Sequence, residues 1–148
     1  MQDPVWVLHD IREVYMVGYW LLVAHLIGDY VLQTDWMAQE KTKGVLPALV
    51  HAVVYTVPFI FIFGDIFEPL LLIAITHFII DRWRLARYVN WARNWVGPPS
   101  HLHSWYDCQK TGCHKDRPDW IAVWLMIITD NAMHLLINGV AWEIWGTG

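Results

Sequence analysis

The chain has 148 residues, 56% of them hydrophobic and 11 of them tryptophan, and its mean hydropathy is +0.31. Its length predicts a single domain. The apolar fraction exceeds the range of ordinary globular proteins and favours an integral membrane protein. A soluble helical bundle is the weaker interpretation, because its helices would need polar faces that most of these segments lack. The net charge of −4 is small, and two cysteines exclude a disulfide framework.

Four apolar segments follow one another along the chain, each near the ~20 residues that cross a bilayer as a helix. They cover approximately residues 14–36, 45–63, 67–95 and 119–145. The third is apolar only as far as Asp81, and Pro58 predicts a kink in the second. We therefore expect an all-α fold: a four-helix transmembrane bundle forming one domain over residues 1–148, with a long loop at 96–118.

Basic residues indicate the orientation of this bundle. Nine of the ten lie within 41–43 or 82–117, and Arg12 is the exception. By the positive-inside rule these two connections face the cytoplasm. The sequence thus predicts an inner-membrane protein with both termini outside the cytoplasm.

The stretch 82–95 mixes arginine with tryptophan and tyrosine. Such side chains suit the headgroup zone of a bilayer, so this stretch is expected to be an interfacial extension of the third helix. A basic, aromatic stretch is also typical of nucleic-acid binding. Beside a membrane span, contact with lipid phosphate is the favoured interpretation. We therefore expect the protein to bind membrane lipid and not nucleic acid.

Histidine and aspartate stand four residues apart three times, each time inside an apolar segment. The pairs are His25 with Asp29, His77 with Asp81, and Asp130 with His134. Residues four apart lie on the same face of a helix, one turn from each other. Ionisable groups are costly inside a membrane and are normally paired and functional there.

His51, early in the second segment, adds a fourth imidazole. In four antiparallel spans all these residues lie roughly 8–20 Å below the cytoplasmic surface, at 1.5 Å per residue. Helical bundles build two-metal sites from such inward-facing carboxylates and histidines. The mixed donors suit divalent zinc first, with manganese or iron as alternatives. The predicted ligands of two ions are His25, Asp29, His51, His77, Asp81, Asp130 and His134. A proton or ion pathway and purely structural pairing are the competing interpretations.

Further polar residues lie near these predicted ligands on the same helices. Gln33, Asn131 and Asn138 are expected to orient the ligands or to contact substrate. The long loop carries a Cys-x4-Cys-His pattern that could form a second, structural zinc site, although ordinary reduced thiols at the surface are the favoured interpretation. The candidate loop ligands are His101, His103, Cys108, Cys113 and His114.

The combined motifs resemble an uncharacterised family of small multi-pass membrane proteins of bacteria and their phages. They are His25-x-x-x-Asp29-x-x-x-Gln33, His51, Thr76-His77-x-x-Ile80-Asp81, Arg117-Pro118-x-Trp120 and Asp130-Asn131-x-x-His134. The resemblance spans about residues 20–140 and implies a helical inner-membrane protein, but it brings no established activity. The His-x-x-x-Asp pattern alone is also similar to membrane-bound metal-dependent hydrolases, which raises the expectation of hydrolysis.

These observations lead to three functional hypotheses. The first is a metal-dependent hydrolase in which two ions lower the pKa of a water and clamp a lipid or lipid-linked phosphoester. Arg82 and Arg84 would then bind its phosphate through their guanidinium groups. The second is a carrier of divalent cations or protons, which with four short spans would have to form a homo-oligomer. The third is an interaction protein in which the metal only stabilises the small helical bundle.

Overall fold

The computed structural model describes residues 5–146, and within them the chain forms helices and turns and no strand. The all-α prediction is confirmed. The long elements are α1 (Val5–Leu26), α3 (Val45–Thr56), α5 (Phe67–Trp83) and α8 (Asp119–Trp145). The shorter elements are η1 (Ile27–Val31), α2 (Asp35–Glu40), η2 (Val57–Phe59), α4 (Ile60–Phe63), α6 (Ala86–Ala92), η3 (Arg93–Val96), η4 (Pro99–His101) and α7 (Trp105–Cys108).

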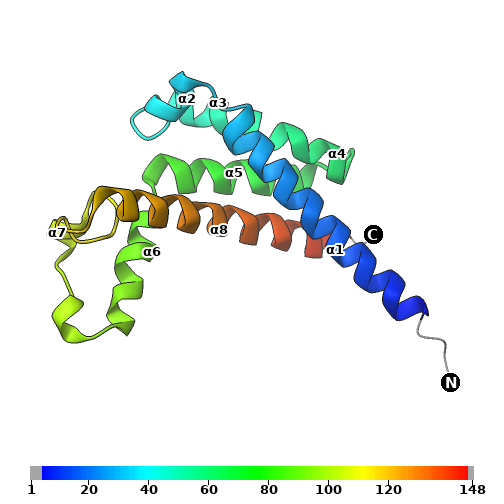
Figure 1. Cartoon of the computed structure of the whole chain (residues 1–148). Coiled ribbons are helices and arrows are strands. Elements are labelled where there is room, and N and C mark those ends of the chain that lie inside the picture. The colour runs from blue at the N-terminus through cyan, green and yellow to red at the C-terminus, as the bar shows by residue number, and fades with distance from the viewer. Residues whose placement is uncertain (1–4, 147–148) are drawn as a thin grey trace.

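The long helices form a bundle in which α5 lies between α3 and α8, and α1 crosses them at an angle (Figure 1). The start of α1 and the end of α8 point toward the same end of the bundle. The connection that contains α2 and the loop that contains α7 lie at the opposite end (Figure 1). The basic connections are thus separated from the terminal helix ends, although the terminal residues themselves lie outside the described part.

Two segments are long and apolar enough to cross a membrane: Val45–Phe63, which includes the turn at Pro58, and Asp119–Trp145. Large apolar side chains of α8, such as Trp124, Ile128 and Leu136, are exposed on the bundle surface. By contrast, α5 has 17 residues, fewer than the ~20 of a perpendicular span. Length and composition therefore identify two of the four expected spans.

The first apolar segment is not one continuous α-helix. After Leu26 the chain widens into the π-helix η1, and helix α2 begins separately after Thr34, whose hydroxyl accepts a hydrogen bond from the Met37 N–H at 3.3 Å. Within η1, a Cβ on Gly28 would lie 2.7 Å from the backbone oxygen of Tyr55. A glycine is therefore required where η1 meets α3, and the prediction of an unbroken helix over 14–36 is corrected.

The third segment also divides, at Arg84 instead of continuing to Trp95. Arg84 is left-handed (φ 50°), and the Leu85 N–H bonds to the Ile80 carbonyl at 2.9 Å, as in a Schellman motif. Helix α6 then turns away from α5 (Figure 1). Its direction is fixed by Asn90, which accepts a hydrogen bond from Thr129 of α8 at 2.7 Å and donates one to the Thr111 carbonyl at 3.1 Å. These tertiary contacts compensate for a left-handed residue that is not glycine.

Candidate metal centre

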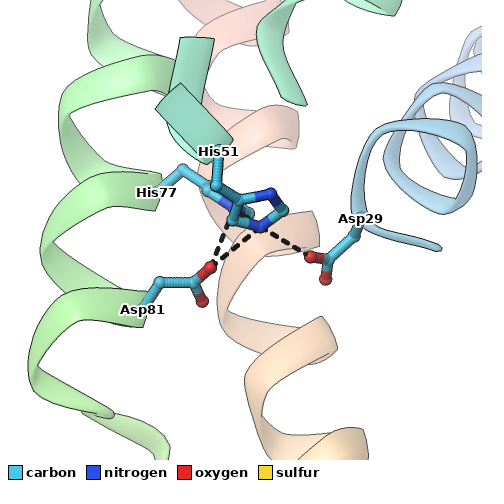
Figure 2. Close-up of side chains that lie close together, drawn as sticks. All are labelled: Asp29, His51, His77 and Asp81. Atoms are coloured by element: carbon cyan, nitrogen blue, oxygen red, sulfur yellow. Dashed lines mark hydrogen bonds and ion pairs between the residues drawn. The ribbon is translucent and has the colours of Figure 1, made fainter. Parts of the chain in front are cut away.

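Four buried side chains from three elements converge inside the bundle (Figure 2). Asp29 comes from η1, His51 from α3, and His77 and Asp81 from α5. Each is at most 4% exposed. One donor atom from each residue lies within 4.8 Å of the donor atoms of the other three. Four carboxylate or imidazole donors at this spacing could hold a metal ion.

The contact distances match the edges of a small coordination sphere. His51 Nε2 lies 3.2 Å from Asp29 Oδ1, 3.1 Å from Asp81 Oδ2 and 3.0 Å from His77 Nε2. His77 Nε2 lies 3.1 Å from Asp81 Oδ2. Tetrahedral zinc with bonds of ~2.0–2.1 Å separates its ligand atoms by about 3.3 Å. These four distances are slightly shorter than that edge, so small outward movements would admit an ion.

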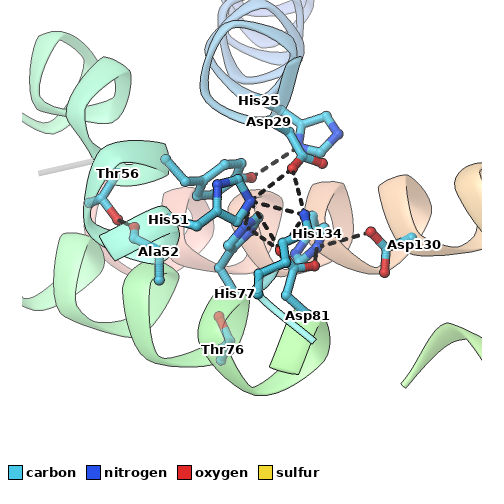
Figure 3. A network of polar contacts seen from close by, with 12 residues as sticks. His25, Asp29, His51, Ala52, Thr56, Thr76, His77, Asp81, Asp130 and His134 are labelled. Carbon is cyan, nitrogen blue, oxygen red and sulfur yellow. Dashed lines mark hydrogen bonds and ion pairs between the residues drawn. The ribbon is translucent and has the colours of Figure 1, made fainter. Parts of the chain in front are cut away.

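A second group shares one member with the first. It consists of Asp29, Asp130 and His134, whose donor atoms also lie within 4.8 Å of one another. His134 Nε2 is 3.5 Å from Asp130 Oδ2 and 3.4 Å from Asp81 Oδ1. Asp29 therefore stands between a four-donor and a three-donor group, and Figure 3 shows them as one network. A shared carboxylate is the arrangement that bridges two ions in helical bundles.

Unpartnered buried atoms test whether these residues fit a metal. Asp81 Oδ2 is buried and makes no well-aligned hydrogen bond within the described residues, although three cationic or imidazole groups lie close to it. A buried carboxylate oxygen in that state suits coordination to an ion. The Nδ1 atoms of His51 and His77 also have no partner there, so the outer hydrogen bond that usually orients a zinc histidine is not formed. The donor set fits, and its outer support is incomplete.

His25 is placed beside the two groups, not within either of them. Its Nδ1 lies 3.0 Å from the Tyr55 hydroxyl and its Nε2 lies 3.1 Å from Asn131 Oδ1. With Tyr55 donating to Nδ1 and Nε2–H donating to Asn131, both ring nitrogens are used. The i, i+4 pairing that holds for His77 with Asp81 is altered here, because the π-turn of η1 rotates Asp29 relative to His25.

Tyr55 is a central residue that the sequence analysis missed. It is fully buried, its hydroxyl accepts a hydrogen bond from Asn138 Nδ2 at 2.9 Å, and its ring stacks on His77 with centroids 3.6 Å apart. It links the imidazole of His25 to that of His77. The available signal was its position four residues after His51, on the same helix face.

Lys41 is the second residue missed. Its ammonium lies 2.7 Å from Asp81 Oδ2, 3.1 Å from His51 Nε2 and 3.6 Å from Asp29 Oδ1. Burial alone would lower the pKa of Lys41, but the carboxylates of Asp81 and Asp29 outweigh that effect and raise it above its ordinary value. The ammonium is therefore charged at neutral pH and lies at the edge of the four-donor group.

The predicted supporting amides have separate roles. Asn131 accepts hydrogen bonds from His25 and from the Tyr30 hydroxyl, the latter at 2.8 Å. Asn138 holds Tyr55. Gln33 is half-buried, and its Oε1 has no hydrogen-bond partner within the described residues. Two of the three amides therefore support the site through Tyr55 and His25, not through the metal donors.

Of the two arginines expected to bind substrate phosphate, Arg82 has its guanidinium engaged in the fold. Arg82 donates from Nη1 to the Thr42 carbonyl at 2.8 Å and from Nη2 to the Lys43 carbonyl at 3.4 Å. Arg84 forms the left-handed end of α5. Arg82 thus holds the connection that carries Lys41, and phosphate binding by the two arginines stays a prediction.

The loop candidates do not join a metal-donor group: among the described residues, both such groups lie in the bundle. His103 and His114 pack with ring centroids 3.9 Å apart, His101 is exposed, and Cys108 and Cys113 are buried with free thiols. Burial raises the pKa of the Cys108 thiol, which disfavours the thiolate that zinc requires.

Comparison of the chain with curated proteins and with solved structures gave no significant match. A family profile does match, over residues 17–143. That range contains every residue of both donor groups as well as Lys41 and Tyr55. The chain therefore belongs to the DUF3307 family, which is described as a protein of unknown function.

Proposed function

We propose that the protein is a membrane-embedded, metal-dependent hydrolase that cleaves a phosphoester in a lipid or lipid-linked substrate. The observation that carries the proposal is the pair of donor groups joined at Asp29, of which the four-donor group is fully buried and the three-donor group is buried except at Asp130. Carboxylates and imidazoles are ligands of zinc, manganese and iron. Two ions sharing a carboxylate form the centre of many enzymes that hydrolyse phosphoesters.

The bundle surface supports a lipid environment. Two segments are long and apolar enough to span a bilayer, and the outward side chains of α8 are largely exposed and apolar. In the proposed arrangement α1 and α5 complete a four-helix transmembrane bundle in the inner membrane. The connections near Lys41 and α7 face the cytoplasm, and the termini lie on the other side. A site at this depth would reach a headgroup more readily than a soluble substrate.

The donor chemistry supports hydrolysis by water. Bound divalent ions lower the pKa of a coordinated water and offset the negative charge of a phosphoester. The donors are carboxylates and imidazoles, which coordinate ions and transfer protons, and neither donor group contains serine or cysteine, so a metal-activated water is the simplest nucleophile. Asp130 has a side chain 24% exposed and pairs with His134. In the proposed centre these two residues hold one ion together with Asp29.

The test begins with metal content. We expect protein purified in detergent to contain zinc, manganese or iron, and Asp81→Ala and His134→Ala to lose at least half of it. Asp35→Asn is the matched control, because Asp35 is an exposed acid outside both groups. Phosphate release from a lipid phosphomonoester in mixed micelles should follow metal content across these variants. Wild-type protein that neither contains metal nor binds added zinc, manganese or iron would refute the proposal.

A further inference from the structure

The Lys41 ammonium contacts three of the four donors that a metal ion in the four-donor group would need. Its Nζ contacts Asp81 Oδ2 at 2.7 Å and His51 Nε2 at 3.1 Å, with Asp29 Oδ1 at 3.6 Å. A divalent ion bonded to those atoms would take the same oxygen and the same nitrogen as ligands. An ammonium and a metal ion repel each other and cannot both take these positions.

The backbone holds this lysine over the site. Arg82, the residue after Asp81, binds the carbonyls of Thr42 and Lys43 at 2.8 and 3.4 Å. Lys43, two residues further on, points outward: its side chain is 65% exposed and pairs with Glu40 at 2.8 Å. The side chain of Lys41, by contrast, is only 16% exposed. Of two neighbouring lysines, one is directed into the donor group and the other to the surface.

We propose that the Lys41 ammonium is the resident cation of the four-donor site in the metal-free protein, and that an entering divalent ion displaces it. The first half depends only on the contacts of Lys41. The displacement rests on the proposed metal site. Because Arg82 retains the connection, the released side chain stays near the site. There its charge would complement a phosphoester.

Lysine reactivity in the wild-type protein tests the proposal directly. Detergent-solubilised protein is treated with an amine-acetylating reagent in the presence of chelator or of zinc ions, and modification is read by mass spectrometry. In chelator we expect Lys41 to react at least tenfold more slowly than Lys43. Zinc should raise the rate at Lys41 by at least tenfold and leave Lys43 unchanged. Equal reactivity of the two lysines in chelator would contradict the claim that Lys41 is the resident cation. Zinc binding without increased reactivity at Lys41 would contradict the claim that the ion displaces it.

Zinc affinity gives a second, independent measurement. Lys41→Met keeps the apolar stem and removes the competing charge, so its dissociation constant for zinc should fall at least tenfold below that of wild type. Lys43→Met is the matched control and should bind zinc as wild type does. An unchanged or weaker affinity of Lys41→Met would contradict competition. If neither wild type nor any variant binds zinc, the hydrolase proposal fails, and so does the displacement of Lys41 by a metal ion. Slow labelling of Lys41 in chelator would still support its place as the resident cation of the site. If Lys41→Met does not fold, the labelling of wild-type protein decides the question.

Discussion

Replacing Gly28 with alanine tests how the π-helix η1 positions Asp29. The added Cβ would lie 2.7 Å from the Tyr55 backbone oxygen and 2.9 Å from Tyr55 Cδ2. A backbone oxygen cannot move aside as a flexible side-chain end does, so η1 must shift away from α3. Overpacking of this kind costs typically ~1–3 kcal/mol, which exceeds the gain of up to ~1 kcal/mol from replacing glycine by alanine in a helix.

For a chain of this length, ~1–3 kcal/mol corresponds to a fall in the unfolding midpoint of roughly 3–10 °C. The shift of η1 also lengthens the 3.2 Å contact between Asp29 and His51, so we expect at least a tenfold loss of zinc affinity. Thermal unfolding in detergent and zinc titration measure the two effects. Gly18→Ala is the control on the preceding helix α1, because a Cβ at Gly18 meets nothing within 4 Å. If Gly28→Ala matches Gly18→Ala in both measurements, the role assigned to η1 is wrong.

Three other substitutions separate the donors from their supports. Tyr55→Phe removes the hydroxyl between two buried polar partners and should destabilise the protein by ~1–3 kcal/mol in thermal unfolding. Bound metal should be retained; its loss would show that the metal donors depend on the Tyr55 hydroxyl. Asp29→Asn removes the shared carboxylate and should lower metal content more than Asp130→Asn does, as measured by elemental analysis; equal losses would argue against a bridge. Asn90→Ala breaks the contacts that join α6 to α8 and should speed proteolysis within residues 97–118; unchanged cleavage would show that other contacts hold α6.

Much of the site follows from helix periodicity alone. His77 with Asp81 and Asp130 with His134 are four residues apart within unbroken α-helices, and each pair is in contact at 3.1 and 3.5 Å respectively. His51 joins them because α3 packs beside α5. These placements need only the geometry of an α-helix and a common depth in antiparallel helices, and both are encoded in residue spacing.

Other features depend on contacts that spacing does not encode. The same four-residue interval fails at His25 and Asp29, because η1 inserts a π-turn between them. Lys41 lies outside every apolar segment, and its inward direction is set by Arg82, which is 41 positions later in the chain. Helix α5 ends at Arg84, where the sequence has no glycine or proline that would predict a helix end. This end is determined by the packing of α6 on α8. In each case tertiary contacts override the local pattern.

The net charge of the site relates the position of the Lys41 side chain to the number of metal ions that the site can hold. Asp29, Asp81 and Asp130 supply three carboxylates, and among the described residues Lys41 is the lysine or arginine within ion-pair distance of them. Metal ligation requires neutral imidazoles, and with neutral imidazoles two negative charges remain uncompensated; leaving charge unpaired in a low-dielectric interior is costly. One divalent ion in the three-donor group would neutralise the cluster while Lys41 stays in place. A second ion in the four-donor group would bring two positive charges, and the site can accept it without excess repulsion only when Lys41 leaves. We therefore expect wild-type protein to bind its two ions in separate steps of unequal affinity, and Lys41→Met to bring those affinities closer together in a zinc titration. Two binding steps of equal affinity in wild-type protein would show that the Lys41 ammonium does not control the affinity for the second ion.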